Sequence, residues 1–247
     1  MRRSLFIATA GLLALSASPV VAQEASPDAS MPAASGSAMV RVLHASPDAP
    51  EVDVYLDGAA VGAPLAALPF GTITPYVEVP AGPHAIKVCA TADATVCPID
   101  VPELTLEAGQ QYTIAATNAL AAIEAQVLTD TGAPAMDQAL VRFVHFAADA
   151  PAVDVLTQDG ATTVAAGLAY PDATEYLPLP AGTYDLKVCA AADHAVCPID
   201  PAPVDLVAGQ VYSVFAIGSL TDGSITGVVA VDTAEMPMGS TAPSSAP

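Results

Sequence analysis

The chain contains an internal duplication, and this constrains its fold more than any other feature. Residues 40–44 read VRVLH, and residues 141–145 read VRFVH, about 100 residues later. Further matches follow in the same order: DAP at 48–50 and 149–151, VDV at 52–54 and 153–155, PAG at 80–82 and 180–182, KVCA at 87–90 and 187–190, and VCPID at 96–100 and 196–200. A period near 100 residues exceeds that of solenoid repeats, which is about 20–45 residues, so the sequence predicts two tandem domains.

Each half carries the pattern of β-strands. Val52, Val54 and Leu56 alternate with polar residues, and turn signals such as Asp57-Gly58 punctuate both halves. Such alternation is typical of strands with one buried face. The fold class predicted is all-β: two tandem immunoglobulin-like antiparallel β-sandwich domains of seven or eight strands each, after a cleaved signal peptide. Only residues 120–126 suggest a turn or two of helix.

The first residues have the pattern of an export signal. Arg2 and Arg3 precede an apolar stretch over residues 5–17, and small residues precede Gln23, which predicts cleavage after Ala22. The stretch is shorter than the roughly 20 residues of a membrane span. We therefore expect a secreted, periplasmic or cell-surface protein with no transmembrane segment in the mature chain. The export route stays open.

Composition and the repeats predict the domain boundaries. They are a signal peptide at 1–22, a disordered lead-in at 23–38, the first β-sandwich repeat at 39–129, a linker at 130–139, the second repeat at 140–232 and a disordered tail at 233–247.

The strongly acidic composition excludes one class of partner. The formal net charge is −20, so the chain offers no basic surface for nucleic acid, and we expect no attraction to an anionic membrane. The acidity fits either a salt-rich habitat or an acidic extracellular protein kept soluble by its charge.

The four cysteines form two local pairs. Cys89 and Cys97 are separated by seven residues, as are Cys189 and Cys197. In an exported chain an even number of cysteines with repeated local spacing predicts Cys89–Cys97 and Cys189–Cys197 disulfides. Zinc is disfavoured because two thiols per repeat leave a tetrahedral site short of ligands, so no metal and no cofactor is predicted.

Histidines and aspartates are the candidate functional residues, and they occur in both halves. They are His44, Asp48 and Asp53 with their equivalents His145, Asp149 and Asp154. A histidine with a carboxylate can act as a general base, and paired carboxylates can bind calcium. However, Ser46 is matched by Ala147, so no nucleophile accompanies both histidines. We favour histidines that cap their strands by bonding to loop backbone, and predict no catalytic residue.

The basic residues that follow the predicted leader are also duplicated. Arg41 matches Arg142, and Lys87 matches Lys187. They suit an anionic ligand or ion pairs with nearby acids, and ion pairs are favoured.

Residues 41–50 (RVLHASPDAP), 52–55 (VDVY) and 76–82 (YVEVPAG) resemble the bacterial family called domain of unknown function 4397. The resemblance covers both repeats, although residues 146–148 and Leu156 depart from the motif. It implies an exported β-sandwich protein and no particular activity.

The leading hypothesis for function is an exported, non-catalytic protein with an envelope, adhesive or matrix role, whose partner is an envelope protein or a glycan. One alternative is a carbohydrate- or small-ligand-binding module, calcium-assisted, around His44 and Asp48. The other is a hydrolase that uses histidine and aspartate.

Overall fold

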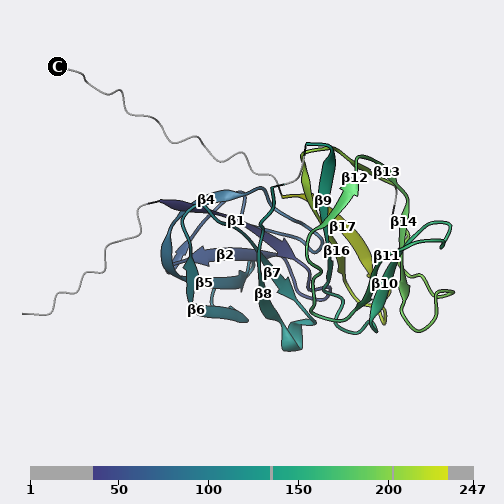
Figure 1. The fold of residues 1–247 in the computed structure, drawn as a ribbon. Helices are drawn as coiled ribbons and strands as arrows, with labels where there is room; N and C mark the ends of the chain where they lie inside the picture. Colours follow the sequence, from purple (N-terminus) through teal and green to yellow (C-terminus); the bar gives the residue numbers. More distant parts are fainter. Residues whose placement is uncertain (1–35, 134–135, 202, 233–247) are drawn as a thin grey trace, which may run out of the picture. The chain divides into compact units, whose positions relative to one another are not determined.

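The computed structural model describes residues 36–133, 136–201 and 203–232 (Figure 1). The predicted signal peptide, nearly all of the lead-in and the predicted tail lie outside these residues. No helix in the described ranges combines the length and apolar character of a membrane span. The predicted all-β fold is confirmed, because strands make up nearly all of the regular structure.

The first sandwich consists of two four-stranded sheets. Their strand orders are β4-β1-β7-β8 and β3-β2-β5-β6, with an apolar core between them. The strands are β1 (Ser37–His44), β2 (Val52–Leu56), β3 (Ala59–Ala60), β4 (Val77–Pro80), β5 (Gly82–Ala90), β6 (Ile99–Leu106), β7 (Gln111–Thr117) and β8 (Glu124–Thr129).

The second sandwich repeats this plan with one sheet divided. Its strand orders are β12-β9-β16-β17, β11-β10-β14 and β13-β15. The strands are β9 (Gln138–His145), β10 (Val153–Thr157), β11 (Thr163–Leu168), β12 (Leu177–Pro180), β13 (Gly182–Tyr184), β14 (Leu186–Ala190), β15 (Val204–Leu206), β16 (Val211–Ile217) and β17 (Thr226–Val231).

One strand pair in each sandwich is parallel, whereas the sequence predicted antiparallel sheets. The first strand lies between two neighbours: β1 pairs antiparallel with β4 and parallel with β7, and β9 does the same with β12 and β16. The other pairings are antiparallel. Sequence periodicity could not reveal this, because it reports which face a side chain occupies and not the direction of the neighbouring strand.

Both faces of β1 are buried, which explains why its sequence does not alternate. Val40 and Val42 belong to the core of the first sandwich, whereas Leu43 belongs to a third apolar cluster shared by the two sandwiches. That cluster consists of Leu43, Ala45 and Ala115 with Val144, Phe146, Phe215, Ile217 and Ala230. We call the contact region between the sandwiches the joint. Among the described strands, each pairs only within its own sandwich.

The connecting segments agree with the sequence in part. The helical turn expected near residue 120 is a single 3-10 turn, η1 (Leu120–Ala122), and β8 ends at Thr129 while β9 begins at Gln138. Asp130, however, is buried, although the composition of residues 130–139 predicted that it belongs to the linker. It belongs to the joint, so the linker proper begins after it.

A proline divides the outer sheet of the second sandwich. In the first sandwich β5 pairs with β6 along its length, including Ile86 opposite Val101. In the second, Val188 still donates to the carbonyl of Ile199 at 2.9 Å, but Pro201 replaces Val101 at the next hydrogen-bonded position. Because proline has no N–H group, the ladder stops there and resumes only at β13–β15.

We expect Pro201→Val to extend the pairing of β14 beyond the bridge between Val188 and Ile199, because valine restores the missing donor. The free energy of unfolding should rise by about 0.5–1.5 kcal/mol, the net contribution of one hydrogen bond. Urea denaturation measures this, and amide exchange should slow in β14. The reciprocal Val101→Pro should have the opposite effect. Unchanged exchange in both variants would contradict this explanation.

Candidate functional site

The two predicted site histidines are buried strand ends. His44 and His145 are both 0% exposed. Each ring places Nε2 3.0 Å from a loop carbonyl, that of Pro50 or Pro151. Burial lowers the pKa of both histidines, and the bond to the carbonyl only partly opposes it. A neutral ring that donates from Nε2 therefore ties the end of each first strand to the loop that follows, as expected for capping histidines.

Asp48 and Asp149 hold the loop that follows the penultimate strand. Asp48 accepts a hydrogen bond from the backbone N–H of Leu120 at 2.7 Å. Asp149 accepts from the N–H groups of Leu220 and Thr221, both at 2.9 Å, and from the hydroxyl of Ser219. Burial acts to raise the pKa of Asp149, but these hydrogen bonds outweigh it and lower the pKa to about 2. Asp149 also lines a small cleft of about 110 Å³.

Asp53 and Asp154 each fasten two segments. Asp53 accepts from the N–H of Ala67 at 2.7 Å and from the hydroxyl of Thr91 at 2.8 Å. Asp154 accepts from the N–H of Gly167 at 2.7 Å and lies 2.7 Å from Nε2 of His194.

The structure does not group the predicted site residues. The histidines bond to backbone carbonyls, and the aspartates bond to other loops. Within the described ranges, no group of three or more histidine, cysteine, aspartate and glutamate side chains is placed to hold a metal ion. The ligand-binding role of the six residues stays a prediction.

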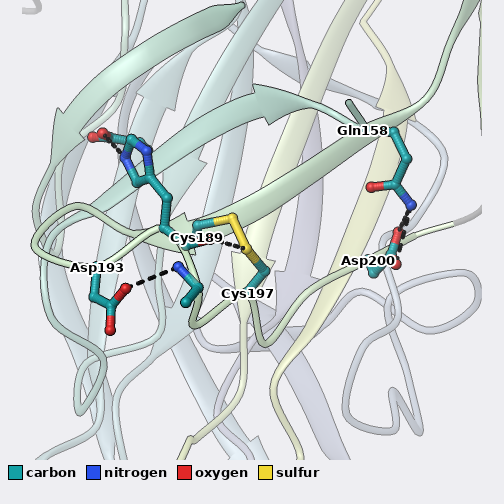
Figure 2. The surroundings of a disulfide bond; sticks show 8 residues. Gln158, Cys189, Asp193, Cys197 and Asp200 are labelled. Carbon is teal, nitrogen blue, oxygen red and sulfur yellow. Dashed lines mark hydrogen bonds and ion pairs between the residues drawn. A yellow bond between two sulfur atoms is a disulfide. The ribbon is translucent and has the colours of Figure 1, made fainter. Parts of the chain in front are cut away.

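The predicted disulfides are present. Cys89 bonds to Cys97, and Cys189 bonds to Cys197. Figure 2 shows the second of these, with Asp193 nearby and the Gln158–Asp200 hydrogen bond in the same view. Each disulfide closes a loop at the end of a strand, β5 in the first sandwich and β14 in the second. The structure thus confirms the pairing deduced from local spacing.

Each closed loop presents one large apolar side chain to solvent. Val96 is 51% exposed and Val196 is 52% exposed, while their carbonyls accept from the N–H groups of Ala90 and Ala190. We call these two segments, residues 89–97 and 189–197, the disulfide loops. Their backbone is held by the disulfide and by these hydrogen bonds, so the exposed valine has a fixed position.

The second disulfide loop has an extra anchor. His194 contacts Asp154 from within the loop, whereas the first loop has Ala94 at that position and Thr91 contacts Asp53 instead. The backbone carbonyl of His194 lies 3.2 Å from Sγ of Cys197. Sequence analysis missed this contact because the two copies use different residues for it.

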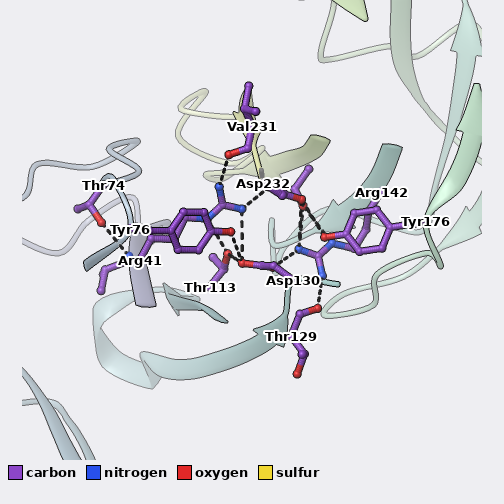
Figure 3. A network of polar contacts seen from close by, with 12 residues as sticks. Arg41, Thr74, Tyr76, Thr113, Thr129, Asp130, Arg142, Tyr176, Val231 and Asp232 are labelled. Carbon is purple, nitrogen blue, oxygen red and sulfur yellow. Dashed lines mark hydrogen bonds and ion pairs between the residues drawn. The ribbon is translucent and has the colours of Figure 1, made fainter. Parts of the chain in front are cut away.

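A buried polar network occupies the joint (Figure 3). Arg41, on β1, donates from Nη2 to the carboxylate of Asp232, which follows the last strand of the other sandwich. Its Nη1 donates to the carbonyl of Val231 at 3.0 Å, and its Nε donates to the hydroxyl of Thr113 at 2.7 Å. The guanidinium lies 4.6 Å from the ring centroid of Tyr76, a cation–π distance.

Arg142, on β9, makes the same contacts in the opposite direction. Its Nη2 donates to Asp130, which follows the last strand of the first sandwich, and its Nη1 donates to the carbonyl of Thr129 at 3.1 Å. Its Nε donates to Ser213 at 3.0 Å, and it lies 4.7 Å from the ring centroid of Tyr176. The predicted ion pairs of the two arginines are therefore present, but each acid comes from the other repeat.

The two carboxylates are satisfied from both sandwiches. Asp130 also accepts from the hydroxyls of Tyr76 at 2.7 Å and Thr113 at 2.5 Å. Asp232 accepts likewise from Tyr176 at 2.8 Å and Ser213 at 2.6 Å. Hydrogen bonds of this kind are what allow charged groups to be buried.

Charge and burial shift the pKa values of Arg41 and of the two tyrosines. Burial acts to lower the pKa of Arg41, but the attraction of Asp232 and Asp130 outweighs it and raises that pKa. Burial and the neighbouring carboxylates raise the pKa of Tyr76 and of Tyr176, although the arginines oppose this. The tyrosines therefore remain neutral hydroxyl donors at neutral pH.

Sequence analysis identified the arginines but missed most of their partners. Tyr76 and Tyr176 are repeat-equivalent, as are Asp130 and Asp232, each followed by threonine. That equivalence was the available signal. It could not show that the partners come from opposite repeats.

A polar cleft of about 410 Å³ adjoins the network. Its lining includes Asp130, Asp232, Gln110, Gln111 and Thr131. Its wall is formed by both sandwiches, so it depends on the joint.

A family model described as "Domain of unknown function (DUF4397)" matches residues 38–156 and 156–242. The two matched segments are consistent with two tandem copies. A search of the curated proteins found no match.

We expect Arg41→Met to lower the free energy of unfolding by about 3–5 kcal/mol, because Asp232 stays buried without its guanidinium. The matched control is Lys87→Met. Lys87 forms an ion pair with Asp100 in which both side chains are about half exposed, so this change should cost less than about 1 kcal/mol. Urea denaturation compares the two. Equal losses would contradict the assignment of the joint as a buried charge network.

We expect Asp149 to contribute to stability above about pH 4 and to lose that contribution as the pH falls toward about 2. The reason is that the pKa of Asp149 is lower in the folded chain than in the unfolded chain, so the ionised form favours folding. Asp149→Asn removes the titration. Chemical denaturation as a function of pH should show a shallower acid decline for this variant. A parallel decline in both proteins would refute the prediction.

Proposed function

Because the chain belongs to the DUF4397 family, whose description assigns no activity, we propose a function from its own geometry: an exported, non-catalytic tandem β-sandwich protein that makes contacts at the cell envelope, in adhesion or in an extracellular matrix. Its partner in this proposal is an envelope protein or a glycan. The proposal treats the two joined sandwiches as one binding scaffold.

One observation carries the proposal: the side chains best suited to catalysis are already used to hold loops. His44 and His145 are fully buried against backbone carbonyls, and Asp48 and Asp149 accept hydrogen bonds from the loops after β7 and β16. A general base must reach a substrate proton, and a buried ring whose Nε2 faces a carbonyl does not do so. These residues therefore favour a scaffold over a hydrolase.

The disulfides support a location outside the cytoplasm. Disulfides persist in oxidising compartments and are rare in reducing ones. With the arginine pair and the apolar stretch at the start of the sequence, they favour a secreted, periplasmic or cell-surface protein.

The disulfide loops are the contact surfaces that we propose. Each repeat presents one half-exposed valine, Val96 or Val196, on a loop fixed by a covalent bond. A fixed loop loses little conformational entropy when it binds. Two equivalent loops on one chain also allow bivalent binding, which increases avidity without any new kind of contact.

We expect Val96→Asp and Val196→Asp together to weaken binding of the purified protein to envelope preparations at least tenfold, and each change alone to weaken it less. The matched control is Val207→Asp, because Val207 is 56% exposed, lies outside both loops and is matched by Glu107 in the first repeat. Surface plasmon resonance on immobilised envelope fractions measures the binding.

A deletion strain tests the function in the cell. We expect loss of surface attachment or of envelope integrity, restored by the unaltered gene and by Val207→Asp, but not by the double loop variant. Normal attachment and envelope integrity in the deletion strain would refute the proposed function. Equal binding by the control and the double variant would refute the proposed surface.

A further inference from the structure

We propose that the joint is a docking surface by which the first sandwich of this chain binds the second sandwich. The first sandwich would accordingly bind the second sandwich without the linker, when the two are separate polypeptides. The proposal is independent of the contacts proposed for the disulfide loops.

The two sides of the joint are built from equivalent residues. Each sandwich supplies an arginine on its first strand, a tyrosine just before its fourth strand, a threonine or serine on its penultimate strand and an aspartate after its last strand. These residues are Arg41, Tyr76, Thr113 and Asp130 on one side and Arg142, Tyr176, Ser213 and Asp232 on the other. Matching residues that face one another are the signature of an isologous, two-fold interface.

The ion pairs cross the joint rather than closing within one sandwich. Arg41 bonds directly to Asp232 and lies 3.7 Å from Asp130 of its own sandwich. Arg142 lies 2.5 Å from Asp130 and 3.9 Å from its own Asp232. A sandwich taken alone would therefore expose an arginine and an aspartate whose better partners are on the other copy. This reciprocity is the mark of a docking surface.

Apolar packing makes the surface selective. Ala45 is matched by Phe146, and Ala115 is matched by Phe215, and all four belong to the shared cluster. The two phenylalanines pack together with ring centroids 6.1 Å apart, whereas the first sandwich has alanines at both equivalent positions. Two first sandwiches would leave this space empty, and two second sandwiches would overfill it. The joint therefore favours a first sandwich against a second one.

A further contact crosses the rim of the joint. The hydroxyl of Tyr170, in the second sandwich, donates to the carboxylate of Glu124 at 2.7 Å and lies 3.2 Å from the hydroxyl of Thr117. Burial and Glu124 raise the pKa of Tyr170 to about 12, although its bond to Thr117 opposes them. This tyrosine is therefore a neutral donor at physiological pH, and its removal tests the surface without leaving a buried charge.

The linker connects the two sandwiches covalently, so a test of the joint must cut it. Both disulfides close within a single sandwich. Met136, in the segment between β8 and β9, is 98% exposed, so a protease can reach this region. Cutting there leaves only the joint to hold the sandwiches together.

The experiment uses the full chain with the site of a specific protease inserted between Ala133 and Met136. After the folded protein is cut, native mass spectrometry and gel filtration at about 10 µM should show both halves in one species. The thermal midpoint of the cut protein should fall on hundredfold dilution, as expected for a dissociating pair, while that of the uncut protein should not. Separate halves at this concentration, folded or unfolded, would overturn the proposal.

Variants of the cut chain test which residues form the surface. Tyr170→Phe removes a hydroxyl that crosses the joint, whereas the control Tyr184→Phe removes one that donates to Pro180 within the second sandwich. Asp130→Asn combined with Asp232→Asn should raise the dissociation constant at least tenfold, Tyr170→Phe should raise it two- to fivefold, and the control should leave it unchanged. If the aspartate variant does not fold, Tyr170→Phe and its control decide alone. Equal dissociation constants for Tyr170→Phe and Tyr184→Phe would overturn the proposed surface.

Discussion

The burial of two first strands on both faces is the constraint on which the rest of the structure depends. One face of β1 and of β9 lies on the core of its own sandwich, and the other face lies on the joint. An arginine on that second face has no access to water and must find its partners within the protein. Asp130 and Asp232 provide them across the joint, with tyrosine and serine or threonine hydroxyls completing the hydrogen bonds. The tandem repeat is thereby a single unit rather than two domains on a linker.

In a joint of this kind, the residues that stabilise the fold are different from the residues on the remaining surface. A buried ion pair adds little net stability by itself, because desolvation offsets its Coulombic attraction, but it strongly disfavours any arrangement that leaves one charge unpaired. Apolar residues such as Phe146 and Phe215 supply the favourable burial. The charges then fix which faces meet. The remaining surface, acidic and carrying two disulfide loops, is free for contacts with other molecules.

The candidate site illustrates how far residue type and spacing go. The disulfide pairing followed from the even number of cysteines and their repeated local spacing in a chain expected to be exported. The histidine–aspartate hypotheses were weaker. His44 and Asp48 are near in sequence, yet they bond to different segments. His44 bonds to Pro50, whereas Asp48 bonds to Leu120, which lies 72 residues after it. A short spacing shows which residues are close along the chain but not which way their side chains point.

The sequence by itself determined the β architecture, its duplication and the disulfides, since these depend on local periodicity, turn residues and repeat equivalence. Only the tertiary structure decided that β1 runs parallel to β7, that Asp130 belongs to the joint and not to the linker, and that each arginine pairs with the other repeat's aspartate. The physical reason is that equivalence between copies is symmetric: it states that two residues play the same role, and a pairing within one sandwich satisfies it as well as a pairing across the joint. The burial of both faces of β1 and β9 decides in favour of pairing across the joint.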